Sequence, residues 1–192
     1  MARERKFTDA ELFAATKVIF IRDGYDSFTF SKLSTVLNVS RGSIYKYYEN
    51  KDELIAEFLM FEMNHFLNEF NTLDKEADFQ TQFQVLIDFI FEYNNSNHIL
   101  DIIKQIQVNS TRTIEDATQS RLSEYYVDMY KQFQGFVDVG RKEKVIKSHL
   151  PTAILLGMIF QTIAIPNHFG IPKEEWIASI KEILCHGMFI NE

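Results

Sequence analysis

The sequence has few of the residues that interrupt helices, with only three prolines and seven glycines among 192 residues. Apolar residues recur at helical rather than alternating spacing along nearly the whole chain. No run of residues has the period of a strand. The sequence therefore predicts an all-α protein, and 46% hydrophobic residues are enough for a packed core.

Cysteine and long apolar runs are scarce too. A single cysteine, Cys185, excludes an intramolecular disulfide and favours a buried thiol in a reducing compartment. The longest apolar run, residues 152–166, is interrupted by Gln161 and is too short to span a bilayer. The first residues are charged and lack the apolar core of a secretion signal. We therefore expect a cytoplasmic protein that does not enter a membrane.

Positive charge is concentrated near the N-terminus of an acidic chain. The formal net charge is −7, which argues against nonspecific coating of nucleic acid. Residues 1–51 nevertheless contain nine Lys and Arg against six Asp and Glu, whereas residues 52–192 contain eleven against twenty-one. This asymmetry favours a small DNA-reading part attached to an acidic remainder.

The helical pattern predicts two domains, with no flexible linker or internal repeat between them. Residues 1–54 are expected to form a small helical domain, and residues 55–192 are expected to form a larger one. The fourth helix joins the two. We expect helices over residues 9–22, 29–38, 41–47, 51–70, 78–93, 98–108, 113–141, 151–165 and 173–189.

The most informative segment is residues 29–54, TFSKLSTVLNVSRGSIYKYYENKDEL. A helix-turn-helix needs apolar packing positions, a small residue where the helices cross and a turn residue that tolerates left-handed φ. These conditions are met, in that order, by Leu33, Val39 and Ile44, by Ser34, and by Asn38. Asn50 is placed to cap the following helix.

Polar residues cover the opposite side of the second helix of this unit. Ser40 is expected to cap that helix, and Thr29 and Lys51 lie at helix starts, where phosphate is favoured. In a major groove, arginine binds guanine in a bidentate manner, and serine, tyrosine and lysine reach phosphates or base edges. The alternative to DNA binding is that this is an ordinary exposed polar helix with an aromatic pair packed beneath it. The predicted DNA-binding residues are Thr29, Ser40, Arg41, Gly42, Ser43, Tyr45, Lys46, Tyr47 and Lys51.

Residues 24–54 resemble the DNA-binding domain of the tetracycline-repressor (TetR) family. The resemblance covers about the first 55 residues, and the rest agrees only in length and helix pattern. Ser34, Asn38 and Tyr48 replace the family's usual alanine, glycine and phenylalanine, and Tyr47 stands where histidine is common. The positions that align with the family's pattern are Gly24, Thr29, Leu33, Val39, Ser40, Gly42, Ile44, Tyr45, Tyr48, Lys51 and Leu54.

The resemblance implies a dimeric, ligand-responsive repressor that binds a palindromic operator. It implies that Thr29 and Lys51 hold phosphates and that the last two helices form most of the dimer interface. It makes residues 1–54 a three-helix, helix-turn-helix DNA-binding domain and residues 55–192 a larger helical domain for dimerisation and for an effector pocket. The residues that it places toward the groove are Arg41, Gly42, Ser43, Tyr45, Lys46 and Tyr47.

The two C-terminal helices are rich in apolar residues, which suits either a core or a dimer interface. A four-helix interface between two copies matches the two-fold symmetry of an operator with half-sites about 34 Å apart, or a multiple of that. The residues predicted for this interface are Ile154, Met158, Ile165, Trp176, Ile180, Ile183 and Leu184.

Eighteen phenylalanines are many for this length. They indicate either an ordinary aromatic core or a cavity for a small apolar or aromatic effector, with a few polar anchors. The residues predicted to line such a pocket are Phe89, Tyr93, His98, Tyr126, Met129, Tyr130, Phe133, Met158 and Gln161.

The sequence gives no support for catalysis, a cofactor or a metal. His98 and Asp101 lie three residues apart and could bind a metal together with another residue, but two ligands are a weak signal. No glycine-rich phosphate loop or nucleophile arrangement occurs. Two alternatives to the repressor stay open: a helical carrier protein whose basic end binds proteins, and a DNA-binding regulator or organiser without an effector.

Overall fold

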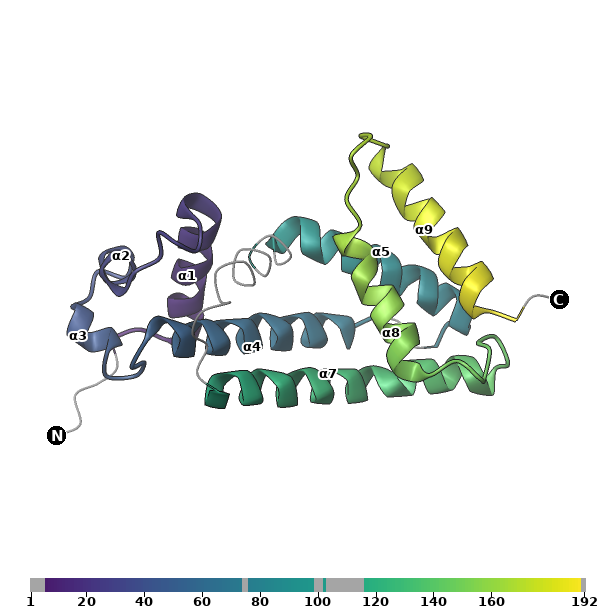
Figure 1. Ribbon diagram of the computed structural model, residues 1–192, viewed down its shortest axis with the longest axis horizontal. Helices are drawn as coiled ribbons and strands as arrows, with labels where there is room; N and C mark the ends of the chain where they lie inside the picture. The colour runs from purple at the N-terminus through teal and green to yellow at the C-terminus, as the bar shows by residue number, and fades with distance from the viewer. Residues whose placement is uncertain (1–5, 74–75, 99–101, 103–115, 191–192) are drawn as a thin grey trace. The chain divides into compact units, whose positions relative to one another are not determined.

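The computed structural model describes residues 6–73, 76–98, 102 and 116–190, and for residues 116–126 and 129 it describes the backbone alone. Over these residues the protein is helical, and its one extended pairing is an isolated antiparallel bridge between Ile146 and Phe189. The all-α prediction is confirmed. The helices, shown in Figure 1, are α1 Asp9–Asp23, α2 Phe30–Val36, α3 Arg41–Ile44, α4 Lys51–Phe70, α5 Phe79–Asn97, α7 Asp116–Lys142, α8 Thr152–Gln161, the 3₁₀ helix η2 Thr162–Ala164, and α9 Lys173–Met188.

The chain divides into two compact units. The first, called the head below, consists of residues 1–65 and 98–124, and the second, called the body, of residues 66–97 and 125–192. The predicted functional division after residue 54 falls inside α4 and stays a prediction.

In the head, α1, α2 and α3 gather at the first turns of α4 (Figure 1). A reciprocal capping box opens α1, since the Thr8 hydroxyl accepts from the Glu11 N–H and the Glu11 carboxylate accepts from the Thr8 N–H. The helix ends at Gly24, whose φ of 80° favours glycine. Several core side chains are fully buried, namely Leu12, Ile19, Leu33, Ile44, Leu54 and Phe58.

The body is held together by two groups of aromatic rings. Phe66 contacts Phe89 and Tyr93 with ring centroids 5.0 Å apart, and Phe133 contacts Phe160 at 4.8 Å. The second group consists of Phe79, Phe83, Phe136 and Phe189, with neighbouring centroids 4.8–6.3 Å apart. Aromatic pairs at these distances are favourable beyond the area that they bury.

Two ion pairs fasten α9 to α5. Lys173 contacts Glu92 and Lys181 contacts Asp88, at 2.8 and 2.7 Å. Pro151 and Pro172 are the N-cap residues of α8 and α9, so each of these helices begins directly after a proline. The helix predicted over residues 98–108 lies outside the described residues except for Ile102, which is helical and part of the head core.

Candidate nucleic-acid interface

The segment from α2 to α3 is a helix-turn-helix, as the sequence predicted. Thr29 caps α2, because its hydroxyl accepts from the Lys32 N–H at 3.2 Å. Asn38 has a φ of 51° and reverses the chain, and the Val39 N–H then donates to the Ser34 carbonyl at 3.0 Å. Ser34 is 6% exposed, which suits a small residue where the two helices cross.

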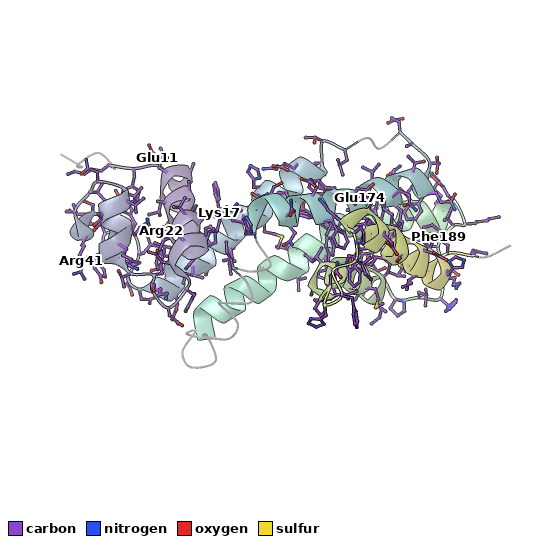
Figure 2. All side chains as sticks on the ribbon, turned by 90° about the horizontal axis from the view of Figure 1, so that it is seen from above. Glu11, Lys17, Arg22, Arg41, Glu174 and Phe189 are labelled. Atoms are coloured by element: carbon purple, nitrogen blue, oxygen red, sulfur yellow. The ribbon has the colours of Figure 1, made fainter. Side chains whose placement is uncertain are left out.

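Helix α3 buries one side and exposes the other. Ile44 is fully buried, while Arg41, Gly42, Tyr45, Lys46 and Tyr47 are exposed and Ser43 is half-buried. The helix ends at Ile44, three residues before the predicted end, and Tyr45–Tyr47 lie in a tight turn in which the Tyr47 N–H donates to the Ile44 carbonyl. Figure 2 shows Arg41 at the outer edge of the head.

The prediction that the Ser40 side chain caps α3 is wrong. Ser40 occupies the N-cap position, but its hydroxyl makes no bond to a backbone N–H. Its oxygen lies 2.8 Å from the Ser43 hydroxyl instead. Two exposed or half-exposed hydroxyl groups therefore lie together at the start of α3, where each can also turn toward an outside partner.

The tyrosines that follow α3 are held by aromatic neighbours. The Tyr45 ring packs edge-on against Phe30 with centroids 4.9 Å apart, and the Tyr47 ring packs edge-on against Phe7 at 5.7 Å. The Arg41 guanidinium carbon lies 5.9 Å from the Tyr45 centroid, within cation–π range. These contacts order polar side chains that are about half exposed.

The cations of the head differ in how far they are neutralised. Arg22 and Lys32 both contact Asp23, at 2.7 and 3.0 Å, and these bonds hold the pKa of the Asp23 carboxyl well below its usual range. Within the described ranges, neither Arg41 nor Lys46 is part of an ion pair. Their charge is therefore available to an anionic partner on the α3 side.

Lys51 lies at the start of a helix, as the sequence predicted. It is the first residue of α4, which Asn50 caps by accepting from the Glu53 N–H at 2.8 Å. The Lys51 ammonium group, however, turns toward the protein and donates to the Tyr25 carbonyl at 2.5 Å. Burial lowers the pKa of Lys51, and nearby carboxylates only partly oppose this effect.

The residues predicted to line an effector pocket are only partly brought together. Phe89, Tyr93 and Phe133 belong to the aromatic group around Phe66, and Tyr130 is half-buried. Three residues that the prediction missed, Phe66, Phe70 and Phe160, complete this group.

Three of the remaining predicted lining residues are exposed. Met158 and Gln161 are exposed, because α8 turns Leu155, Leu156 and Ile159 inward. His98 is exposed and belongs to the head. The side chains of Tyr126 and Met129 lie outside the described residues, as does Asp101.

The predicted dimer residues separate into two groups. Ile154, Met158, Ile165 and Ile183 are 48–68% exposed. Ile180 and Leu184 are 6% and 3% exposed and pack inside the body, while Trp176 is half-buried. Sequence spacing alone did not separate these groups, because apolar residues cover more than one side of α8 and α9.

The described residues contain neither a membrane-spanning helix nor a metal-binding cluster. No helix there is long and apolar enough to cross a membrane. No group of three or more histidine, cysteine or carboxylate side chains is arranged there to hold a metal ion.

Similarity to known proteins agrees with this geometry. Residues 12–58 match the family model described as bacterial regulatory proteins, tetR family. A fatty acid metabolism regulator protein of Bacillus subtilis (strain 168) is 24% identical over 151 residues, which is 78% of this chain and 76% of that protein. An uncharacterized HTH-type transcriptional regulator of Haemophilus influenzae is 35% identical over 68 residues, a match that spans 35% of each protein.

A solved structure extends the likeness to the whole fold. The transcriptional regulator FadR from Bacillus subtilis, in complex with stearoyl-CoA, has a TM-score of 0.75 at 19% identity and covers 94% of this chain and 99% of that one. A helix-turn-helix with exposed cations, followed by further helices, defines a DNA-binding transcriptional regulator. Residues 12–58 match the DNA-binding part of the tetR family, and the whole chain shares the fold of the solved regulator FadR.

Proposed function

We propose that the protein is a dimeric repressor that binds a palindromic operator and leaves it when a small apolar effector binds the body. The observation that carries the proposal is the exposed pair of cations at α3, Arg41 in the helix and Lys46 in the turn after it. Both lie outside any ion pair within the described residues, and the buried Ile44 fixes the helix beneath them. Acting on DNA places the protein in the cytoplasm.

Each exposed residue of the helix-turn-helix has a role in this proposal. Arg41 reads a base edge, with guanine as its natural partner, and Lys46 binds phosphate or a base edge. Hydroxyl groups of Thr29, Ser40, Ser43, Tyr45 and Tyr47 bind phosphates or base edges beside them. Phosphate contacts set the position on the duplex, and base contacts supply specificity.

We assign dimerisation to exposed apolar residues of α8, α9 and the end of η2, namely Ile154, Met158, Ile165 and Ile183. An added Cβ at Gly157 of α8 or Gly187 of α9 would meet nothing within 4 Å, so both glycines leave room for a partner helix. A two-fold dimer presents two copies of α3 to two half-sites, which explains why the operator is palindromic.

A long apolar chain is the effector that these features favour. The body contains many aromatic rings, and the similar protein of Bacillus subtilis was solved with stearoyl-CoA. We therefore propose a long-chain acyl thioester of coenzyme A as the first candidate. Its binding shifts α4, which continues from the head into the body, and so changes the spacing of the two α3 helices.

The first experiment is selection of bound sequences from random duplex DNA. A palindromic consensus bound by a dimer supports the proposal, and absence of enrichment by a folded protein contradicts it. Arg41→Ala and Lys46→Ala are expected to weaken binding of that consensus by about tenfold or more each, since one base contact contributes about 1–3 kcal/mol. Lys131→Ala, which changes an exposed lysine of the body, is the control and is expected to bind normally.

The effector is tested on the same consensus DNA. Stearoyl-CoA is expected to lower operator affinity about 5- to 150-fold, the usual range of allosteric coupling. Coenzyme A without an acyl chain is the control. A carrier protein would bind stearoyl-CoA without any operator, and a regulator without an effector would bind the operator unchanged at saturating stearoyl-CoA.

A further inference from the structure

The loop that joins η2 to α9, residues 165–172, exposes a phenylalanine ring (Figure 1). Phe169 is 92% exposed, which makes it the most exposed large apolar residue of the part of the chain that the structure describes. Phenylalanine is among the residues that proteins most often bury completely. The Phe169 ring therefore gains almost nothing from its own chain and would gain much from burial against a partner.

Hydrogen bonds hold this loop in one shape. The Asn167 side-chain N–H donates to the Ile171 carbonyl at 2.7 Å, and the Asn167 side-chain oxygen accepts from the Ile171 N–H at 2.9 Å. Gly170 has a φ of 64°, which favours glycine, and Pro172 restricts the backbone where α9 begins. The Phe169 ring is thus presented by a closed loop, which has little backbone freedom left to lose on binding.

The loop continues the surface that the proposed function assigns to the dimer. Ile154 and Met158 lie four residues apart, and therefore on one side of α8, and are 59% and 54% exposed. Ile165, which is 48% exposed, follows directly after η2 and lies four residues before Phe169. A stable interface buries about 800 Å² of each partner, and one aromatic ring that buries about 150–250 Å² is a substantial share of that area.

The charges beside the loop disfavour a membrane as the partner of the ring. Glu174 and Glu175 lie in the first turn of α9 and are exposed. Lys173, directly before them, contacts Glu92 at 2.8 Å. Segments that insert apolar side chains into a bilayer surface are typically rich in lysine and arginine, which attract anionic lipids. A second copy of this chain is therefore the partner that these observations favour.

We propose that residues 165–172 form a dimerisation arm, and that Phe169 of each copy packs against the body of the partner subunit. The proposal rests on the proposed function, because it concerns the dimer that presents two α3 helices to an operator. It adds a loop to the contacts of α8 and α9. It also gives the interface an aromatic anchor, and aromatic residues are enriched in the buried centres of interfaces.

Sedimentation equilibrium without DNA tests the ring. We expect Phe169→Ser to raise the dissociation constant of the dimer about tenfold or more, because burial of a large side chain is lost from both copies of a two-fold interface. Phe169→Tyr keeps the ring and should dimerise nearly as tightly as the wild type. Val127→Ser is the matched control, since Val127 is 54% exposed on α7. Circular dichroism should show that all three variants fold normally.

Asn167→Ala tests whether the shape of the loop matters. The variant keeps Phe169 but removes both side-chain hydrogen bonds to Ile171. We expect it to weaken the dimer less than Phe169→Ser does, because the ring is still present but must be ordered on binding. A dimer as tight as that of the wild type would show that the closed loop contributes nothing to the arm.

Photo-cross-linking supplies a measurement that does not depend on the strength of the dimer. The photoreactive amino acid p-benzoylphenylalanine is incorporated in place of Phe169 and, as the control, in place of Val127. Irradiation of the full chain is expected to give covalent dimers from residue 169 and none from residue 127. Absence of covalent dimers from residue 169, in a protein that sediments as a dimer, would overturn the proposal.

The outcomes separate this proposal from the proposed function. A wild-type protein that sediments as a monomer at every concentration contradicts the dimeric repressor, and the arm with it. If the wild type is dimeric and Phe169→Ser dimerises equally tightly, only the arm fails. In that case, binding to phosphatidylcholine vesicles by the wild type but not by Phe169→Ser would assign the ring to a membrane surface instead.

Discussion

Gly42 is a helical glycine that the free protein does not require. A Cβ built at this position would come no closer than 4.0 Å to another side chain, that of Ser40. Glycine inside a helix costs about 1 kcal/mol relative to alanine. Close approach to an outside partner explains this cost, and the partner that we propose is the DNA backbone.

Gly42→Ala is therefore expected to stabilise the free protein by about 0.5–1 kcal/mol and to weaken operator binding. Thermal melting and titration with operator DNA measure the two effects. Gly135→Ala is the matched control, because Gly135 is also helical and an added Cβ there meets nothing within 4 Å. It should give a similar gain in stability with unchanged binding. Wild-type operator affinity of Gly42→Ala would rule out close approach at this residue.

Gly140, unlike Gly42, has no room for a side chain in the free protein. An added Cβ would lie 2.7 Å from the Phe79 ring and 2.8 Å from the Ile146 side chain, both of which are buried. Gly140→Ala is expected to destabilise the protein by about 1–3 kcal/mol, because a well-packed core yields little. Urea denaturation, with Gly135→Ala alongside, checks this value. Equal stability of the two variants would show that the aromatic group rearranges freely.

At the scale of helices, a buried ion pair joins α1 to α4 within the head. The Lys17 ammonium lies 2.8 Å from the Glu62 carboxylate, and the two side chains are only 19% and 10% exposed. Lys17→Met leaves a buried carboxylate without that ammonium group. We expect a loss of about 3 kcal/mol, since breaking a buried pair is far more costly than breaking a surface pair.

The double variant Lys17→Met/Glu62→Leu should recover much of this loss, because it removes the carboxylate as well. Urea denaturation of the single and double variants measures the coupling. Lys131→Ala, which breaks the exposed contact with Asp128, is expected to change stability by less than about 1 kcal/mol. If the losses in unfolding free energy of the two single variants simply added up in the double variant, Lys17 and Glu62 would not be a cooperative pair.

Local rules predicted the helices better than they predicted which side of each helix is buried. The caps by Thr29 and Asn50 and the left-handed turn at Asn38 depend on neighbours within three residues, so the sequence contains their signals. Helix α8 is apolar on almost every side, and its pattern therefore did not show that Met158 points outward. That outcome depends on packing against the rest of the body.

The site shows the same division between local and distant signals. Exposed Arg41 and Lys46 follow from helical spacing within the helix-turn-helix. The contact of Lys51 with Tyr25 joins residues 26 apart in the chain, and spacing within α4 contains no sign of it.

At the scale of the whole molecule, operator binding depends on a second copy of the chain. Two half-sites bound by a dimer give a much higher affinity than one half-site, because the second contact is intramolecular. Met158 and Ile183 are 54% and 68% exposed on helices that the proposed function places in the dimer. A charge at either position opposes burial against a partner helix without disturbing the core of its own chain.

Met158→Glu and Ile183→Glu are therefore expected to give folded monomers that bind a full palindrome no better than a half-site. Analytical ultracentrifugation measures the mass, and titration with full and half operators measures affinity. Val127→Glu is the matched control, since Val127 is 54% exposed on α7 of the body. It should remain dimeric. If the α8 and α9 variants stayed dimeric while Val127→Glu became monomeric, the interface would lie on α7, and an effector in the body would act across that helix instead.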